Sequence, residues 1–469
     1  MARRVADNLE NDKGRIWEQD RRHHLHPFTH FESFNEQGSL VMSKGQGCYV
    51  TDMDGKEYFD AVGGMWCTNI GLGRKEMADA IAAQVEQLAY ANPFTDMTNA
   101  PAAQLAARLS ELAPGDLNHV FFTCGGSTAN DSAFRLIQMY QGSRGKPGKK
   151  HILCRHDAYH GTTYLAASMS GKASDRMPEF NYIDDIIHHL RSPNYYRAPE
   201  GLDENEFCDL LIDEMEQKIL ELGPENVAAF FAEPVMGSGG VIVAPDGYLR
   251  RCRDLTSKYD ILFVADEVVT AFGRLGHWFA SESQFGIQPD IITCAKGLTS
   301  AYLPLGAVIF SDRMYDTMGG DADRWFTGGY TYSGHPVCCT AALKNIEIME
   351  REKIFDNVRD VGPYFEERLH SLLDLPIVGD IRGMAFMMCV VNIANKETKE
   401  FFAPEINIGK RISNKAEELG IIVRPAADLN ILSPSLTMTR DDVDLVVSRL
   451  RKAIELTTED LVAEGLWSP

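Results

Sequence analysis

Lys296 has the surroundings that nucleophilic amine chemistry requires. It follows the apolar run Ile291–Cys294, which is typical of a buried strand, and it precedes a glycine. A lysine in a partly desolvated site loses its proton more readily, and the neutral amine can form an imine with a carbonyl group. A single lysine at a strand end is more often a solvated charge, so this motif needs support from others.

A carboxylate at the end of another strand-like run offers that support. The run Ile261–Ala265 ends in the acidic pair Asp266 and Glu267. A buried carboxylate beside the nitrogen of a heteroaromatic ring keeps that nitrogen protonated, so that the ring can accept electrons. We expect Asp266 to have this role. A metal ligand or a helix cap is the alternative interpretation of the same motif.

A phosphate site is indicated by the glycine-containing turn after His119–Thr123. Two glycines, the second of them Gly126, end this strand-like run, and a helix is predicted to begin at Ser127. Backbone amides at a helix N-terminus attract a phosphate group. An ordinary glycine turn with Ser127 as the helix N-cap is the alternative.

Tyr159, which follows the run His151–Arg155, offers an aromatic face for stacking on a ring, or alternatively packs as a half-buried side chain. The phosphate turn, the aromatic ring, the carboxylate and the lysine follow successive strand-like runs. Ligand sites of open α/β sheets lie at the carboxyl ends of the strands, so one shared site is expected. The predicted strands are His119–Thr123, His151–Arg155, Val227–Ala232, Ile261–Ala265, Ile291–Cys294 and Ala307–Phe310.

Stretches of helical periodicity alternate with these runs, which predicts an α/β fold with a mostly parallel central sheet flanked by helices. Residues 61–335 are predicted to form this large domain, and 336–469 a smaller α+β domain. Residues 1–60 contain a hairpin around a D-x-D-G turn and are expected to pack with the small domain. Residues 169–206 are expected to leave the sheet and to carry no catalytic group.

Composition excludes several classes of function. Lys and Arg number 46 against 67 Asp and Glu, a net charge of −21, and this field repels nucleic acids and anionic membranes. The ten cysteines contain no C-x-x-C pair, which is typical of free thiols in a reducing cytosol. We find neither a signal peptide in residues 1–20 nor a run of about 18 apolar residues, so a cytoplasmic protein is expected.

The chain resembles the class III aminotransferases, which have fold type I of the pyridoxal 5′-phosphate (PLP) enzymes. The resemblance covers nearly the whole chain and is carried by AEPVMGSGG (232–240), DEVVTAFGRLG (266–276), CAKGLTSAYLPLGAV (294–308) and YTYSGHPV (330–337). It implies transfer of an amino group from an amine donor to a keto acid. It also implies a homodimer with shared active sites, which could pair further into a tetramer.

The resemblance assigns a role to each matching residue. Lys296 would be the covalent anchor and the general acid and base, Asp266 the partner of the pyridine nitrogen, and Tyr159 the stacking ring. Val268 would pack on the other face of the ring. Gly126 and Ser127 would hold the phosphate, and Thr331 would reach the phosphate bound in the neighbouring subunit.

Further similarity to the ω-amino acid and amine:pyruvate transaminases concerns the substrate. MWCTNIGLG (65–73) resembles a pocket strip in which Trp66 is a wall, and HPFT (26–29) resembles an entrance segment. VRPAAD (423–428) resembles the stretch in which an arginine, here Arg424, clamps a carboxylate. His23, His24, His26 and His30 lie near the entrance segment, and we expect them to bind no metal.

The chain departs from this pattern at two places. Thr128 stands where many relatives have a glutamate in the phosphate loop, so the polar contacts there must differ. Relatives acting on ornithine or 4-aminobutyrate often have a glutamate after the EPV-x-G stretch, whereas this chain has Gly237-Ser-Gly-Gly240, which favours pyruvate as the acceptor. A PLP-dependent decarboxylase or aminomutase is the alternative within the fold. Intact Lys296, Asp266 and Tyr159 argue against a non-catalytic binding protein.

Overall fold

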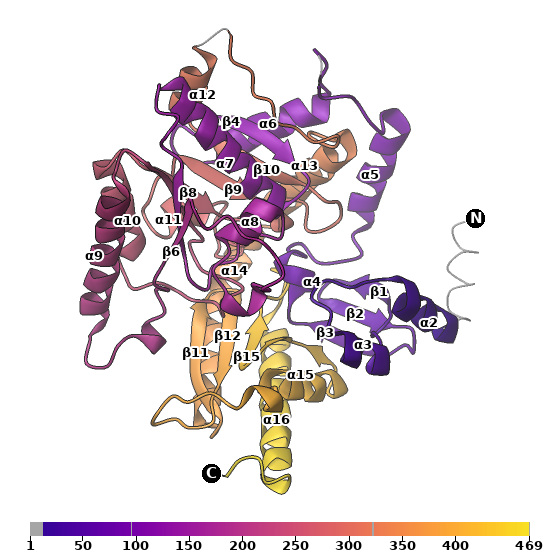
Figure 1. Ribbon diagram of the computed structural model, residues 1–469. Helices are drawn as coiled ribbons and strands as arrows, with labels where there is room; N and C mark the ends of the chain where they lie inside the picture. The colour runs from indigo at the N-terminus through magenta and orange to yellow at the C-terminus, as the bar shows by residue number, and fades with distance from the viewer. Residues whose placement is uncertain (1–12, 95, 321–322, 469) are drawn as a thin grey trace.

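The computed structural model describes residues 13–94, 96–320 and 323–468. Three sheets organise this part of the chain: one of seven strands and two of four. The seven-stranded sheet and its helices form the upper part of Figure 1, and the two smaller sheets lie below it, beside the N- and C-terminal segments.

The seven-stranded sheet is mostly parallel. Its strands, in spatial order, are β4 (His119–Thr123), β10 (Gly306–Phe310), β9 (Ile291–Cys294), β8 (Leu262–Asp266), β7 (Val227–Ala232), β5 (His151–Arg155) and β6 (Ile187–Leu190). Only β10 runs against its neighbours; the other six strands share one direction. The α/β architecture that the sequence predicts is therefore confirmed.

Both faces of this sheet are buried, because successive side chains of a strand point to opposite faces. Phe230 packs into the core that contains α6, α9, α10 and α13, whereas its neighbour Phe231 packs into the core that contains α7, α8 and α12. The helices of this part are α5 (Lys75–Gln87), α6 (Ala100–Leu112), α7 (Gly126–Ser143), α8 (Tyr164–Met169), α9 (Glu204–Leu222), α10 (Tyr248–Lys258), α11 (Ala280–Ser283), α12 (Asp312–Gly319) and α13 (Pro336–Arg351).

All six predicted strands are present, with small shifts at two of them. β8 extends to Asp266, so that the acidic residue is the last residue of its strand. The expectation that residues 169–206 leave the sheet was wrong for β6, which pairs in parallel with β5. The sequence of β6, IHHL, has two central histidines in place of an apolar run, and this composition concealed an edge strand.

Segments from the two ends of the chain combine in a small sheet of the order β1–β2–β3–β13. Its strands are β1 (Met42–Gln46), β2 (Tyr49–Asp52), β3 (Glu57–Asp60) and β13 (Ile421–Ile422). The predicted hairpin is confirmed, since β2 and β3 are antiparallel and joined by the D-x-D-G turn. Pairing of β3 with β13 places the N-terminal segment, including α2 (Lys13–His23), α3 (Phe31–Gln37) and α4 (Gly63–Trp66), beside the C-terminal elements.

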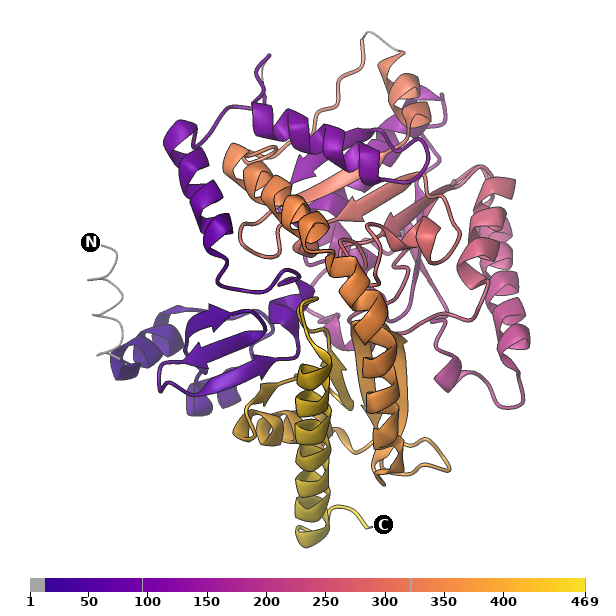
Figure 2. The same cartoon turned by 180° about the vertical axis from the view of Figure 1, so that it is seen from behind.

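The third sheet is antiparallel and consists of C-terminal strands alone, in the order β11–β12–β15–β14. Its elements are β11 (Val378–Met384), β12 (Met387–Asn392), β14 (Arg424–Ala426) and β15 (Leu429–Leu432), with helices α14 (Ile354–His370), α15 (Ile408–Glu418) and α16 (Arg440–Ala463). Figure 2 shows α13 followed by α14, which descends beside α16.

The buried side chain of Arg274 forms hydrogen bonds between these C-terminal strands and the rest of the chain. The guanidinium of Arg274 donates hydrogen bonds to the carbonyl oxygens of Phe386 (3.2 Å) and Pro434 and to Oδ1 of Asn69 (2.9 Å). The Arg274 side chain is fully buried, so these contacts compensate for its lost hydration. Arg274 thereby links the segment after β8 to Asn69 and to the C-terminal strands. No helix of the described residues is long and apolar enough to cross a membrane.

Candidate active site

A pocket of about 420 Å³ lies where β5, β7, β8 and β9 end. Eight of the nine residues that the sequence assigns to the site line it: Trp66, Gly126, Ser127, Tyr159, Asp266, Val268, Lys296 and Arg424. The ninth, Thr331, lies outside the pocket of its own chain and is exposed, and its carbonyl oxygen accepts a hydrogen bond from the hydroxyl of Tyr90 at 2.9 Å. The fold thus collects side chains that lie up to 358 positions apart in sequence.

Lys296 follows β9 and begins a short 3₁₀ turn that ends at Leu298. Its backbone has a φ of 44°, a left-handed conformation that a non-glycine residue adopts only where its surroundings enforce it. Asn345 provides such support, because its amide donates to the carbonyl oxygens of Gly297 (2.8 Å) and Leu298 (3.0 Å). Burial lowers the pKa of the Lys296 amine, which makes the neutral, nucleophilic form more accessible.

Asp266 offers a buried carboxylate held by three N–H donors. Its Oδ2 accepts from Nδ2 of Asn130 (2.8 Å) and from Nδ1 of His160 (2.7 Å), and its Oδ1 accepts from the amide of Val268 (3.1 Å). Only 3% of the Asp266 side chain is exposed. These hydrogen bonds fix the orientation of both oxygens, so the carboxylate can pair with a cation in the pocket.

Sequence reasoning missed both side chains that hold Asp266. His160 directly follows Tyr159, and Asn130 lies one helical turn after Gly126 on α7. The Asn130 side chain also donates to the carbonyl oxygen of His160 (2.7 Å) and accepts from the hydroxyl of Thr293 (2.8 Å). The sequence did contain a signal for Asn130. It lies four residues after Gly126, and residues with this spacing share one face of a helix, so the spacing places Asn130 on the same face of α7 as Gly126.

The turn predicted to hold a phosphate forms the N-terminus of α7. This 18-residue helix begins at Gly126, one residue earlier than predicted, and its N-cap is Gly125, which has no side chain to satisfy the first amides. The N-cap role considered for Ser127 is therefore wrong. Its hydroxyl oxygen instead accepts a hydrogen bond from the amide of Thr162 at 3.1 Å, which leaves the hydroxyl proton available.

Close packing shapes this end of the pocket. A Cβ atom on Gly126 would lie 2.8 Å from a methyl group of Val268, so only glycine fits there. Thr128, which replaces the glutamate of many relatives, donates its hydroxyl proton to the carbonyl oxygen of Gly125 at 2.9 Å. The altered contact is thus local to the turn, and the first amides of α7 stay without a side-chain partner.

Glu233, which follows β7, is a second buried carboxylate that sequence reasoning missed. Its two oxygens accept from the amides of Tyr159 (3.0 Å) and Gly237 (2.9 Å). Burial raises the pKa of Glu233. The contacts fix the segment that presents Tyr159 to the pocket. The motif AEPVMGSGG contained this residue, but nothing in its composition distinguished a backbone-binding glutamate from a catalytic one.

The remaining wall comes from outside the large sheet. Trp66 is 2% exposed and has a φ of 64°, and its neighbours in the pocket are Met65, Pro27 and Phe28. A large aromatic side chain in a left-handed conformation is strained, which is typical of residues whose position serves a site. The predicted entrance segment 26–29 therefore supplies part of the pocket.

Arg424, on β14, completes the pocket from the C-terminal part. Among the described residues, no carboxylate lies within ion-pair distance of its guanidinium, and burial lowers the pKa of Arg424. Asp175 also lines the pocket, so residues 169–206 contribute a side chain that the sequence did not predict there. Its carboxylate instead accepts from the hydroxyl of Ser174 and pairs with Lys172 at 3.2 Å.

Comparison with known proteins identifies one family of relatives. The family model described as aminotransferase class-III matches residues 33–454. The chain is 38% identical over 462 residues to the putrescine–pyruvate aminotransferase of Pseudomonas aeruginosa, covering 98% of this chain and 100% of that protein. It is 36% identical over 458 residues to the diaminobutyrate–2-oxoglutarate transaminase of Halomonas elongata, covering 96% and 97%.

The structure of an (S)-enantioselective ω-transaminase from Thermomicrobium roseum is similar to this one, with a TM-score of 0.92 and 40% sequence identity over 95% of this chain and 98% of that one. This chain therefore belongs to the class III aminotransferase family, with the fold type I architecture.

Proposed function

We propose that this aminotransferase uses PLP to move an amino group from an amine or ω-amino acid donor to pyruvate. The observation that carries the proposal is the presence, in one pocket, of a desolvated lysine and an arginine whose guanidinium forms no ion pair within 4.0 Å among the described residues, with the Asp175 carboxylate as a more distant influence. Lys296 serves the amino group, and Arg424 serves the carboxylate of the acceptor. A pocket without the lysine could not handle the amino group, and a pocket without the arginine would lack a partner for the carboxylate of the acceptor.

The described residues fit the cofactor at three points. The uncapped amides of α7, with the hydroxyl of Ser127, suit its phosphate, because a helix N-terminus carries unsatisfied N–H groups. Tyr159 and Val268 would flank its ring, and the Asp266 carboxylate would accept a hydrogen bond from its ring nitrogen. When bound, PLP supplies a carbonyl group for covalent attachment and a ring that accepts electrons from the substrate carbon.

Lys296 acts twice in the proposed reaction. Its neutral amine would hold the cofactor covalently, and the same amine, when free, would carry a proton to and from the reacting carbon. Desolvation suits both roles, because it weakens the preference of the lysine for its charged form. The Asp266 carboxylate would pair with the ring nitrogen. Trp66 and Phe28 line the pocket on the side of the entrance segment.

Pyruvate is favoured over 2-oxoglutarate by the residues of the pocket. Arg424 can bind one carboxylate through two parallel N–H donors. The segment after Glu233 is Pro-Val-Met-Gly-Ser-Gly-Gly, which offers no further cation for the second carboxylate of 2-oxoglutarate, and Ser238 is its polar side chain in the pocket. The similarity to a putrescine–pyruvate aminotransferase supports the same acceptor.

The proposal includes a homodimer with shared sites in the cytoplasm. Thr331 is exposed and lies outside the pocket of its own chain, as a residue that completes the site of a neighbouring subunit would. All ten cysteines are described and free, and eight of them are buried, which suits a reducing compartment. The large part at 61–335, the small part at 336–469 and the N-terminal segment at 1–60 remain the proposed domains.

An absorbance experiment tests the proposal. Purified holoenzyme is mixed with a panel of amines and ω-amino acids, and then with pyruvate or 2-oxoglutarate. The absorbance of the lysine-bound cofactor is expected to fall with a suitable donor and to return with pyruvate. Release of carbon dioxide, or formation of an isomer of the donor without amino transfer, would instead support the decarboxylase or the aminomutase. A spectrum that returns only with 2-oxoglutarate would contradict the proposed acceptor.

A further inference from the structure

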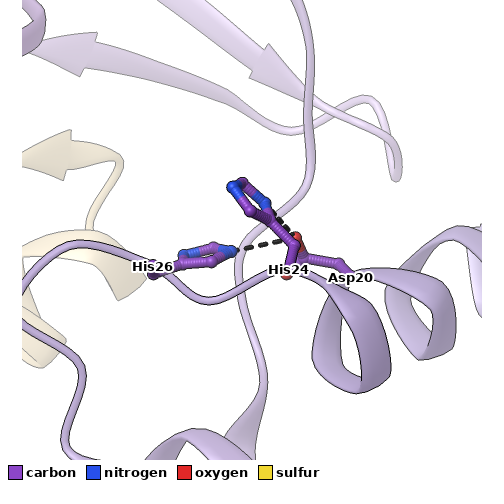
Figure 3. A group of neighbouring side chains, drawn as sticks. All are labelled: Asp20, His24 and His26. Atoms are coloured by element: carbon purple, nitrogen blue, oxygen red, sulfur yellow. Dashed lines mark hydrogen bonds and ion pairs between the residues drawn. The ribbon is translucent and has the colours of Figure 1, made fainter.

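Three potential metal ligands converge at the end of α2, away from the residues assigned to catalysis. Oδ1 of Asp20 lies 2.9 Å from Nε2 of His26 and 3.0 Å from Nδ1 of His24. One ligand atom from each of the three side chains lies within 4.8 Å of the others. Figure 3 shows both imidazole rings pointing toward the Asp20 carboxylate, His24 at the end of the helix and His26 in the segment that follows it.

Neighbouring contacts hold this cluster in place. The second carboxylate oxygen of Asp20 accepts a hydrogen bond from the hydroxyl of Ser39 at 2.9 Å, which orients the oxygen that faces the imidazoles. The ring of His26 packs against Phe34 of α3, with 4.9 Å between ring centroids. Arg21 ties α2 to α3 by donating to the carbonyl oxygen of Asn35 at 2.7 Å. The ligands are therefore positioned by two helices and not by a free chain end.

We propose that Asp20, His24 and His26 bind a divalent transition-metal ion, for which Zn²⁺ is the reference. Two imidazoles and one carboxylate match the ligand preference of zinc, and three protein ligands leave a fourth position for water. Each imidazole binds through the nitrogen that now faces Asp20 and carries its proton on the other nitrogen. Exposure of 68% for the His24 side chain and 32% for that of His26 gives the ion access from solvent.

The location of the cluster gives the metal a consequence for the active site. Pro27 and Phe28 directly follow His26 and line the proposed catalytic pocket. The same segment, with His26, also lines an adjoining cavity of about 720 Å³, so it forms a wall between two spaces. Phe28 has a φ of 54°, a conformation that must be held by its surroundings. An ion bound to His26 would hold the segment of Pro27 and Phe28 in place, because His26 directly precedes the first of these pocket residues.

The proposal departs from the expectation that these histidines bind no metal. The sequence shows four histidines, but His23 and His30 take no part in the cluster, and Nδ1 of His30 contacts the hydroxyl of Ser33 at 3.0 Å. The additional ligand is Asp20 of α2; His24 directly follows this helix, and its amide donates to the carbonyl oxygen of Asp20 at 2.9 Å. Two histidines alone would be a weak site, and the carboxylate supplies both the third ligand and the negative charge.

Calorimetric titration of Zn²⁺ into the chelator-treated, tag-free holoenzyme tests the proposal. We expect one ion per chain, with binding weakened roughly tenfold or more in Asp20→Asn, His24→Ala and His26→Ala. Co²⁺ in place of Zn²⁺ should give a visible spectrum typical of nitrogen and oxygen ligands in the native protein and not in His24→Ala. Because His24 is exposed, this variant should keep the melting temperature of the native protein.

His23→Ala is the matched control, since it removes an adjacent exposed histidine that contributes no ligand. It should bind Zn²⁺ as the native protein does. The proposal would be overturned by the absence of a stoichiometric site, or by equal losses in His23→Ala and His24→Ala, which would indicate general binding by surface histidines.

Saturating Zn²⁺ should also change the KM for the amine donor in the native enzyme and not in His24→Ala; an equal response of both would refute the link to the pocket wall.

Discussion

Nδ1 of His160 donates a hydrogen bond to Oδ2 of Asp266 at 2.7 Å, with the histidine side chain fully buried and the aspartate 3% exposed. Asn130 donates to the same oxygen at 2.8 Å. The two donors fix the Asp266 carboxylate in a buried part of the pocket, which both of them also line. His160 and Asn130 are thus positioning residues.

Replacement of His160 by alanine should impair the enzyme through Asp266. Loss of a buried hydrogen bond to a charged group costs about 1.5–3 kcal/mol, which predicts a fall in kcat/KM of about ten- to a hundredfold and weaker retention of PLP. The measurement is steady-state kinetics together with cofactor content after dialysis. His188→Ala is the control, because His188 contacts His151 and lies outside the pocket. Similar losses in both variants would remove the positioning role.

Lys296→Ala should abolish multiple turnover. Proton transfer by a positioned side chain alone contributes about 10²–10⁴-fold to a rate, and this variant also loses the covalent attachment. Borohydride treatment followed by mass spectrometry should locate the cofactor on Lys296 in the native protein and on no residue of the variant. Sustained turnover by Lys296→Ala would disprove the assignment, whereas Lys258→Ala, which alters an exposed lysine paired with Glu216, should keep full activity.

The lowered pKa of Lys296 predicts how cofactor attachment depends on pH. Because burial favours the neutral amine, cofactor-free protein should react with PLP at a rate that rises with pH through the lowered pKa and levels off below the ordinary value of 10.5. Between those two values the unfolded chain binds more protons than the folded one, so this lysine also makes folding more favourable as pH rises. Stopped-flow absorbance measures the rate. A midpoint at or above 10.5 would contradict the desolvated lysine.

Arg424→Ala should weaken pyruvate far more than a monoamine donor without a carboxylate. A paired guanidinium and carboxylate form two parallel charge-assisted hydrogen bonds, and each contributes about 1.5–3 kcal/mol. The KM for pyruvate should therefore rise about tenfold or more, and Arg424→Lys should recover only part of the loss because an ammonium cannot bind in the same bidentate manner. Half-reactions measured separately with donor and acceptor distinguish the two effects. Equal losses in both would exclude Arg424 as the clamp.

Arg274→Met should destabilise the fold at the contact between the large sheet and the C-terminal strands. The substitution leaves the buried carbonyl groups of Phe386 and Pro434 without their donor, at a cost of about 1–3 kcal/mol for each unsatisfied group. Differential scanning calorimetry should show a Tm several degrees lower. Arg368→Met, which breaks an exposed ion pair with Asp444, should have a much smaller effect. An equal effect of the two variants would contradict the role of Arg274.

Much of the large sheet could be predicted from the sequence, and so could the lysine and the carboxylate of the site. Apolar runs such as Ile291–Cys294 and Val227–Ala232 are buried on both faces, so their composition alone identifies them as strands. Lys296 and Asp266 follow such runs directly, and the carboxyl ends of parallel strands meet at one edge. The sequence therefore determined that these two side chains share a site.

Only the tertiary structure decided which groups from distant parts of the sequence complete the site. β6 has no apolar run because an edge strand is half covered, and Asp175 enters the pocket from a segment without periodicity. The roles of His160 and Asp20 depend on contacts with Asp266 and with His26, which no local pattern encodes. Side-chain type and strand periodicity are local properties that a sequence displays, whereas the partner of a buried polar group is set by how separate elements pack.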